Sequence, residues 1–156
     1  MTDPSDALAS FQQALLDGQI QLQQGAHDRN LFVHSNRPDG VTRRLTYVRL
    51  NRQTVAALAM FVMTEPLDGL PCFHIGYAVP EAYRGNGHAK SIVESSIAEL
   101  KHGLLRNNIS TFYVEAIVGT DNKASNRVAV ATISATPVAV TDELSGLPAF
   151  QYVRKV

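Results

Sequence analysis

The chain is poor in cysteine: Cys72 is the single one among its 156 residues. A lone cysteine cannot form an internal disulfide, and no metal-ligand spacing surrounds it, so we expect neither a disulfide scaffold nor a bound metal. An excess of charge of either sign is also missing, because 14 Lys and Arg balance 14 Asp and Glu. Net charge therefore gives no reason to expect nucleic acid or an anionic membrane as a partner.

Long hydrophobic runs are missing too. The longest, Val55–Met63, is far shorter than the roughly 20 residues that span a bilayer. The N-terminal stretch carries acids and glutamines where a secretory signal needs a basic flank and an apolar run. With 45% apolar and 18% charged residues, the composition is that of a folded globular protein. We expect a soluble, cytoplasmic protein whose residues 1–156 form one domain.

The spacing of apolar residues predicts an α/β domain with a mixed sheet. Helix and strand compete over Thr54–Thr64, and its β-branched ends favour a buried strand. The expected helices are a first one capped by Ser5 and Asp6 and stopped by Gly18, then His88–Leu105, and a third capped by Thr120–Asn122 and ending near Ile133. The expected strands are Leu31–His34, Arg44–Leu50, Thr54–Thr64, Cys72–Val79, Ser110–Val118, Val138–Val140 and Phe150–Val156, with Gln19–Asn30 irregular and Glu65–Pro71 a loop.

The most informative segment is Tyr83–Ala89, which lies between an expected strand and the expected helix His88–Leu105. Gly85 and Gly87 permit positive φ angles and a close approach of a ligand to the backbone. The first N–H groups of a helix have no partner within it and lie at the positive end of its dipole, which suits phosphate oxygens. Arg84 adds a fixed cation at the entrance. This loop predicts a phosphate-binding site.

Three glycine-rich phosphate motifs compete for this loop. A nucleoside-triphosphate loop requires glycines where Ala89 and Arg84 stand, and a dinucleotide-binding loop requires a third glycine where Lys90 stands. The third pattern is Arg or Gln, two residues, Gly, one residue, and then Gly or Ala. Arg84, Gly87 and Ala89 fit it in a strand–loop–helix context.

On these residues the chain resembles the GNAT superfamily of acyl-CoA-dependent N-acetyltransferases. Ile75–Glu81 is similar to that family's fourth strand and its exit into the loop. Downstream, Asn122, Ser125, Val128 and Ala129 resemble the branch that includes ribosomal-protein N-terminal acetyltransferases. The resemblance extends from about Cys72 to Ala131. It implies a mixed, mostly antiparallel twisted sheet flanked by helices, and acetyl-CoA as cosubstrate.

The resemblance implies a set of cofactor-binding residues. The N–H groups at the start of the helix would hold the pyrophosphate, and Arg84 would either help at the phosphates or hold the loop in shape. The backbone of Tyr77–Val79 would pair with the pantetheine arm. Asn122 would bond the same arm or cap its helix, and Ser125 would contact the thiol end or act as a cap. The full set is Tyr77, Ala78, Val79, Arg84, Gly85, Asn86, Gly87, His88, Ala89, Asn122 and Ser125.

The catalytic groups are less clearly marked. Glu115 lies in an apolar strand, where burial would raise its pKa and suit a base, and His74 is a second candidate; both also fit structural roles. Tyr77 is a candidate proton donor, although a core aromatic explains it as well. The tyrosine that supplies the proton in many members is Ala129 here, and Ile133–Ser134 replaces the usual Gly-Phe helix ending. Catalysis by proximity without a dedicated base stays open.

The acceptor is expected to be the amine of a small molecule or a peptide. Asp142 and Glu143 in one loop, and Glu65 and Asp68 in another, can attract a cationic amine, but turns are often acidic because they are wet. A non-catalytic acyl-CoA-binding or regulatory module and a plain interaction domain are the alternatives. Pairing of exposed sheet edges allows a homodimer.

Overall fold

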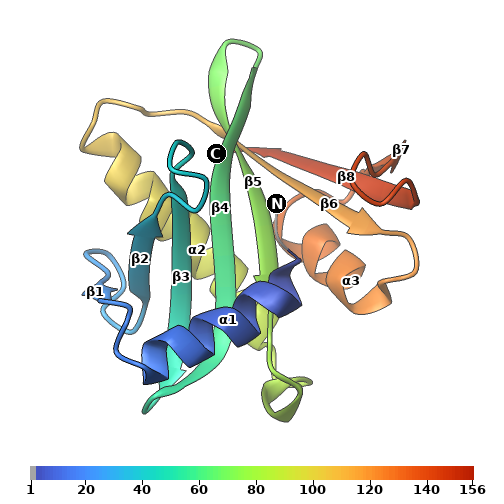
Figure 1. Cartoon of the computed structure of the whole chain (residues 1–156). Helices are drawn as coiled ribbons and strands as arrows, with labels where there is room; N and C mark the ends of the chain where they lie inside the picture. The colour runs from blue at the N-terminus through green and yellow to red at the C-terminus, as the bar shows by residue number, and fades with distance from the viewer. Residues whose placement is uncertain (1–2) are drawn as a thin grey trace. The chain divides into compact units, whose positions relative to one another are not determined.

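The computed structural model describes residues 3–156 (Figure 1). The helices are α1 (Pro4–Leu16), α2 (His88–Leu105) and α3 (Lys123–Thr132), with a 3-10 turn at Glu81–Tyr83. The strands are β1 (Gln23–Gln24), β2 (Phe32–Asn36), β3 (Arg44–Asn51), β4 (Thr54–Leu67), β5 (Leu70–Ala78), β6 (Tyr113–Gly119), β7 (Val138–Thr141) and β8 (Pro148–Lys155).

The strands form one mixed sheet in the order β1-β2-β3-β4-β5-β6-β8-β7. β5 and β6 run parallel, whereas β1–β2, β2–β3, β3–β4, β6–β8 and β7–β8 are antiparallel pairs. The expected mixed, mostly antiparallel sheet flanked by helices is therefore confirmed. The chain divides into two compact units, one up to Met63 with Gly76–Ser110 and one of Thr64–Ile75 with Thr111–Val156. The strands β4 and β5 each contribute residues to both units.

In the first unit, α1 packs on β3 and β4. Its Phe11 joins a buried cluster with Val48, Val55, Leu58 and Met60. A register shift between Arg49 and Leu50 gives β4 one extra residue there, so Val55 and Leu58 reach the same cluster despite their odd spacing. The bulge explains why the apolar alternation of this region is imperfect in the sequence.

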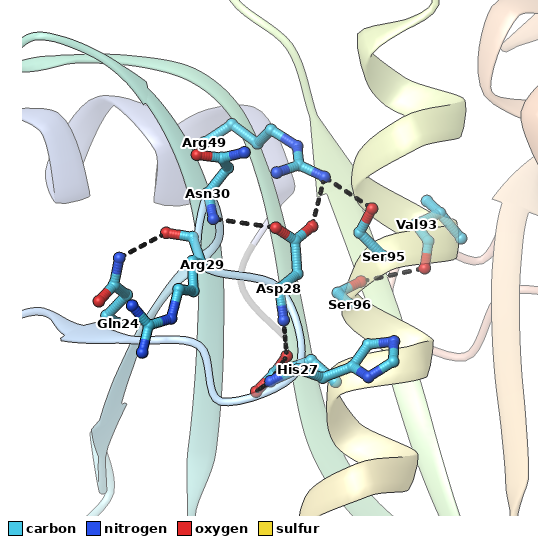
Figure 2. Close-up of polar contacts among 10 residues, drawn as sticks. Gln24, His27, Asp28, Arg29, Asn30, Arg49, Val93, Ser95 and Ser96 are labelled. Atoms are coloured by element: carbon cyan, nitrogen blue, oxygen red, sulfur yellow. Dashed lines mark hydrogen bonds and ion pairs between the residues drawn. The ribbon is translucent and has the colours of Figure 1, made fainter.

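A polar network joins α2 to the segment before β2 (Figure 2). Arg49 of β3 donates to Asp28 at 2.9 Å and to the Ser95 hydroxyl of α2 at 2.7 Å. Glu99, buried on α2, accepts hydrogen bonds from the backbone N–H groups of Ala26, His27 and Asp28. These contacts fix α2, and with it the loop at its N-terminus, within the first unit.

In the second unit, α3 packs on β6 and β8. The Tyr152 hydroxyl of β8 donates to Asn126 of α3 at 2.7 Å, and Arg154 donates to the Thr132 carbonyl at 2.9 Å. The α3-facing side chains of β6, such as Val114, are buried. Because side chains alternate along a strand, Glu115 faces away from α3.

One loop prediction is wrong. Glu65–Pro71 is not a loop, because β4 continues to Leu67 and β5 begins at Leu70. Asp68 and Gly69 connect them with φ angles of 50° and 75°. Positive φ at both central residues is the mark of a tight hairpin turn, for which Asp-Gly is a preferred sequence. Pro66 is exposed and Pro71 is half-buried, so both prolines lie outside the fully buried part of the hairpin.

Two smaller predictions also change. The first helix is capped by Asp3, whose carboxylate accepts from the N–H groups of Ser5 and Asp6, so the cap lies earlier than expected. Within the irregular segment Gln19–Asn30, Gln23–Gln24 pairs with β2. The buried strand preferred over a helix at Thr54–Thr64 is present as part of β4. Within residues 3–156, no helix combines the length and apolar character that crossing a bilayer requires.

Candidate functional site

The expected phosphate loop lies between the end of β5 and α2 in the first unit. Gly85 and Gly87 have φ angles of 80° and 77°, which side-chain-bearing residues rarely adopt. A Cβ atom placed on either glycine would meet no atom within 4 Å, so the space beside the loop is open. The two glycines therefore serve the backbone conformation and leave room for a ligand.

The N-terminus of α2 offers backbone donors. Gly87 is the N-cap residue and supplies no side-chain cap, and the first intrahelical bond runs from the Ser91 N–H to the Gly87 carbonyl at 3.0 Å. The N–H groups of His88, Ala89 and Lys90 precede that bond and have no acceptor within the helix. Together with the helix dipole they suit a phosphate group.

Three side chains hold this loop in place. Arg84 donates from Nε to the Val79 carbonyl at 3.0 Å, and Asn86 donates from Nδ2 to the Arg84 carbonyl at 3.3 Å. The Tyr83 hydroxyl accepts from Asn51 at 3.0 Å, and its ring meets the ring of His88 edge to face at 5.9 Å between centroids. Asn51 was not expected at this site, and its place at the end of β3 gives no local signal for it.

The end of β5 leads directly into the loop. Tyr77 has a buried side chain, whereas Ala78 and Val79 are half-buried. The role expected for this backbone, pairing with the pantetheine arm, stays a prediction.

In the second unit, Asn122 is the N-cap of α3. Its Oδ1 accepts from the Ser125 N–H at 3.1 Å. Asn122 therefore caps its helix, which is one of the two roles considered for it. The contacts of Asn122 and Ser125 with a cofactor stay predictions.

The two candidate bases meet on neighbouring strands of the second unit. His74 of β5 pairs in register with Glu115 of β6, and its Nδ1 lies 3.3 Å from Glu115 Oε1. Gln151 of β8 donates to the other carboxylate oxygen at 2.7 Å. The side chains of His74 and Glu115 are 23% and 18% exposed, so both are sheltered yet reachable. No motif pointed to Gln151, because only the pairing of β6 with β8 brings it to Glu115.

The pKa of Glu115 lies below its ordinary value, against the rise expected from burial. The hydrogen bond with His74 lowers this pKa most; burial opposes the shift, and the hydrogen bond from Gln151 and the charge of His74 add to it. The carboxylate is therefore a weak base. It suits orienting His74 instead: with the proton on Nδ1 facing the carboxylate, the lone pair of Nε2 can accept a proton.

Ala129, which the resemblance aligns with the proton-donating tyrosine of many GNAT enzymes, has no group that can donate a proton. Ala129 is fully buried on α3, and Ile133 is the C-cap residue of the helix. The nearby Tyr152 is buried, which raises the pKa of its hydroxyl, and it donates to Asn126.

The acidic loop residues make contacts of their own. Asp142 caps the β7–β8 turn by accepting from the Leu144 N–H at 3.0 Å, and Asp68 accepts from the Tyr113 hydroxyl at 3.2 Å. A turn bond thus accounts for Asp142, whereas Asp68 is paired with a hydroxyl of β6. Among residues 3–156 no group of three or more histidines, cysteines and carboxylates is arranged to hold a metal ion.

Solved structures that this chain resembles include acetyltransferases. The acetyl transferase from Salmonella typhimurium that modifies the N-terminal serine of ribosomal protein L7/L12 aligns with a TM-score of 0.53 and 22% identity, over 72% of this chain and 64% of that one. Ribosomal-protein-S5-alanine acetyltransferase from Vibrio fischeri gives 0.55 and 16%, over 73% and 61%. The NatC complex bound to Gag peptide and CoA gives 0.53 and 15%, over 96% and 90%.

These similarities confirm the resemblance at the level of the fold, which is that of the GNAT acetyltransferases. The aligned region spans less than two thirds of the first two proteins. No family model matches the sequence, and no curated protein matches it.

Proposed function

We propose that the chain is an acetyl-CoA-dependent N-acetyltransferase that moves an acetyl group to a primary amine by direct attack on the thioester. The observation that carries this proposal is the uncapped N-terminus of α2 behind two left-handed glycines, in a fold shared with acetyltransferases. The acceptor is the amine of a small molecule or of a peptide. An acetyl transferase that modifies an N-terminal serine and a spermidine N-acetyltransferase, both with this fold, support the two kinds of acceptor alike.

In this proposal the N–H groups of Gly85–Ala89 bind the pyrophosphate of acetyl-CoA. Backbone donors and the helix dipole stabilise the bound anion, so a chain with no net positive charge can bind the pyrophosphate. The backbone of Tyr77–Val79 pairs with the amides of the pantetheine arm, as an added strand would. Asn122 and Ser125 are the further proposed contacts of that arm.

The chemistry requires a neutral amine. An alkylamine with a pKa of about 10.4 loses its proton at pH 7 at a cost of roughly 4–5 kcal/mol, unless a base assists. We assign the base to His74 Nε2, with Glu115 holding the imidazole by its Nδ1 side. The amine nitrogen forms the new C–N bond, the Val79 N–H donates to the developing oxyanion, and the C–S bond breaks. His74 passes the proton of the starting ammonium ion to solvent, accepts the second proton from the amine nitrogen as the C–N bond forms, and transfers it to the leaving thiolate.

Tyr77 is the residue of β5 that the sequence suggests as a proton donor. Because side chains alternate along β5, it faces the side of the strand opposite His74, and its ring is buried. These features suit a packing role, so the proposal places the proton relay on His74.

The buried Ala129 favours a second candidate function, a non-catalytic acyl-CoA-binding module. With alanine at position 129, the chain lacks the tyrosine that protonates the thiolate in many members of the family. Such a module binds acetyl-CoA but releases no CoA thiol with any amine. An amine panel with a thiol-reactive dye separates the two functions.

The deciding experiment is thermal unfolding with and without acetyl-CoA. A ligand at about 100 times its dissociation constant stabilises the folded state by roughly 2.7 kcal/mol, which raises the melting temperature of a protein of this size by about 5–10 °C. We expect this rise for the wild type and its loss in Gly87→Trp, whose side chain occupies the open space beside the loop.

The matched control is Gly40→Trp. Gly40 has a φ angle of 78°, close to the 77° of Gly87, and open space around its Cβ position, but it lies in the β2–β3 connection. Both variants share the backbone strain, so Gly40→Trp should keep the full response to acetyl-CoA. If wild type shows no rise at millimolar acetyl-CoA, the proposed function is wrong.

A further inference from the structure

We propose that Arg84 is a positioning residue: its Nε–H, bound to the Val79 carbonyl, holds the loop whose N–H groups receive the pyrophosphate. This inference rests on the proposed function for the identity of the ligand. It chooses between the two roles that the sequence leaves open for Arg84, contact with the phosphates and maintenance of the loop.

The bond of Arg84 closes the path from β5 to the first loop glycine. After Val79 the chain turns at Pro80, and the N–H groups of Tyr83 and Arg84 donate to the carbonyls of Pro80 and Glu81 at 2.9 and 3.2 Å. The Arg84 side chain then reaches back 3.0 Å to the Val79 carbonyl. The segment is thereby held at its two ends by one side chain.

The residues that follow need such an anchor. Gly85 and Gly87 visit positive and negative φ about equally when unconstrained, so by themselves they do not keep the neighbouring N–H groups pointing one way. The side-chain amide of Asn86 donates to the Arg84 carbonyl at 3.3 Å. This bond links the glycine segment to Arg84, whose own side chain is bound to Val79. Ordering the loop before the ligand arrives reduces the entropy lost on binding.

A direct charge contact is the weaker explanation. Arg84 is exposed, and an exposed ion pair contributes little, because water weakens the attraction and the long side chain loses freedom. The helix N-terminus already supplies fixed donors for the anion. The hydrogen bond that the Arg84 guanidinium makes in this structure runs from Nε to the Val79 backbone carbonyl.

Side-chain length makes the two roles separable. The Nε2 of a glutamine is attached to Cδ, as the Nε of arginine is, so Arg84→Gln keeps a donor at the clamping position and removes the charge. Arg84→Lys keeps the charge but places a methylene at that position. Arg84→Met removes both. Arg106→Gln, at the exposed C-cap of the same helix, is the matched control for the loss of an arginine charge.

The first measurement is the backbone ¹⁵N order parameters of residues 85–89 in the unliganded protein. We expect order parameters of about 0.85 in wild type, Arg84→Gln and Arg106→Gln, and below about 0.6 in Arg84→Lys and Arg84→Met. Equal order parameters in all five proteins overturn the inference, whether or not CoA binds. Unchanged melting temperatures show that the variants are folded.

The second measurement is the affinity for CoA, for dephospho-CoA, which keeps the pyrophosphate, and for pantetheine, which lacks it. We expect Arg84→Lys to weaken the affinity for CoA and for dephospho-CoA equally, by about tenfold, and to leave the affinity for pantetheine unchanged. Arg84→Gln should keep all three affinities within about threefold of wild type. The positioning role is overturned if Arg84→Lys keeps the affinity for CoA, Arg84→Gln loses it, and the size of that loss depends on salt. Wild type without affinity for CoA refutes the proposed function, and the order parameters of residues 85–89 still test whether Arg84 holds the loop.

Discussion

Glu99→Gln is expected to destabilise the protein by removing an acceptor from a buried turn. The Glu99 side chain is buried on α2 and accepts from the Ala26 N–H at 2.6 Å, from the His27 N–H at 3.0 and 3.2 Å, and from the Asp28 N–H at 2.9 Å. One carboxylate oxygen faces Ala26 and the other faces Asp28. A glutamine has one acceptor oxygen, so either orientation of its amide points an NH₂ group at a backbone N–H.

The magnitude follows from these contacts. A buried donor left without an acceptor costs about 1–3 kcal/mol, and the remaining bonds change from charged to neutral, which costs about 1 kcal/mol more. We therefore expect a loss of about 2–4 kcal/mol in the free energy of unfolding. That is a large part of the stability of an ordinary domain.

Urea unfolding followed by far-UV circular dichroism measures this loss. Glu94→Gln is the matched control, because it makes the same substitution on the exposed face of the same helix and should change stability by less than about 0.5 kcal/mol. A loss below about 1 kcal/mol for Glu99→Gln, with an unchanged slope against urea, would refute the role given to these hydrogen bonds.

Two further predictions concern titratable groups of the second unit. The pKa of Glu115 is depressed in the folded state, first by its hydrogen bond with His74, so ionised Glu115 contributes stability above the ordinary pKa of about 4.3, and the contribution is lost as the pH falls through the folded value. Urea midpoints of wild type and Glu115→Gln should therefore converge as the pH falls from 7 towards 2, and a constant difference would contradict the assignment. Burial raises the pKa of the Cys72 thiol to about 11, and the side chain is 2% exposed, so a disulfide reagent at pH 7.5 should modify it only as fast as the protein opens. Immediate modification of the folded protein would show that this description of Cys72 is incorrect.

Local patterns in the sequence predicted several elements well. The apolar stripe of residues 88–105 predicted a helix with the bounds that α2 has, because amphipathic periodicity and the preceding Gly87 are local signals. The glycines of the phosphate loop were also found locally, since positive φ is a property of single residues. The Asp68-Gly69 turn carried a local signal as well, but Pro66 and Pro71 around it suggested a loop.

The surroundings of the candidate base could not be predicted in this way. A single strand predicts that Glu115 is shielded and that its pKa rises. The opposite shift depends on His74 and Gln151, which come from two other strands and meet the carboxylate only through the pairing of β5 with β6 and of β6 with β8. Strand register joins residues far apart in the chain, and no local pattern records it.

The sequence by itself therefore determined the helix α2, the glycine loop before it and the resemblance that points to acetyl-CoA. These depend on backbone conformations and periodicities that a few neighbouring residues specify. Tertiary structure decided that Glu99 holds the turn before β2 and that His74 and Glu115 form a pair. Such contacts depend on the distances that strand pairing and helix packing impose, which the order of residues does not state.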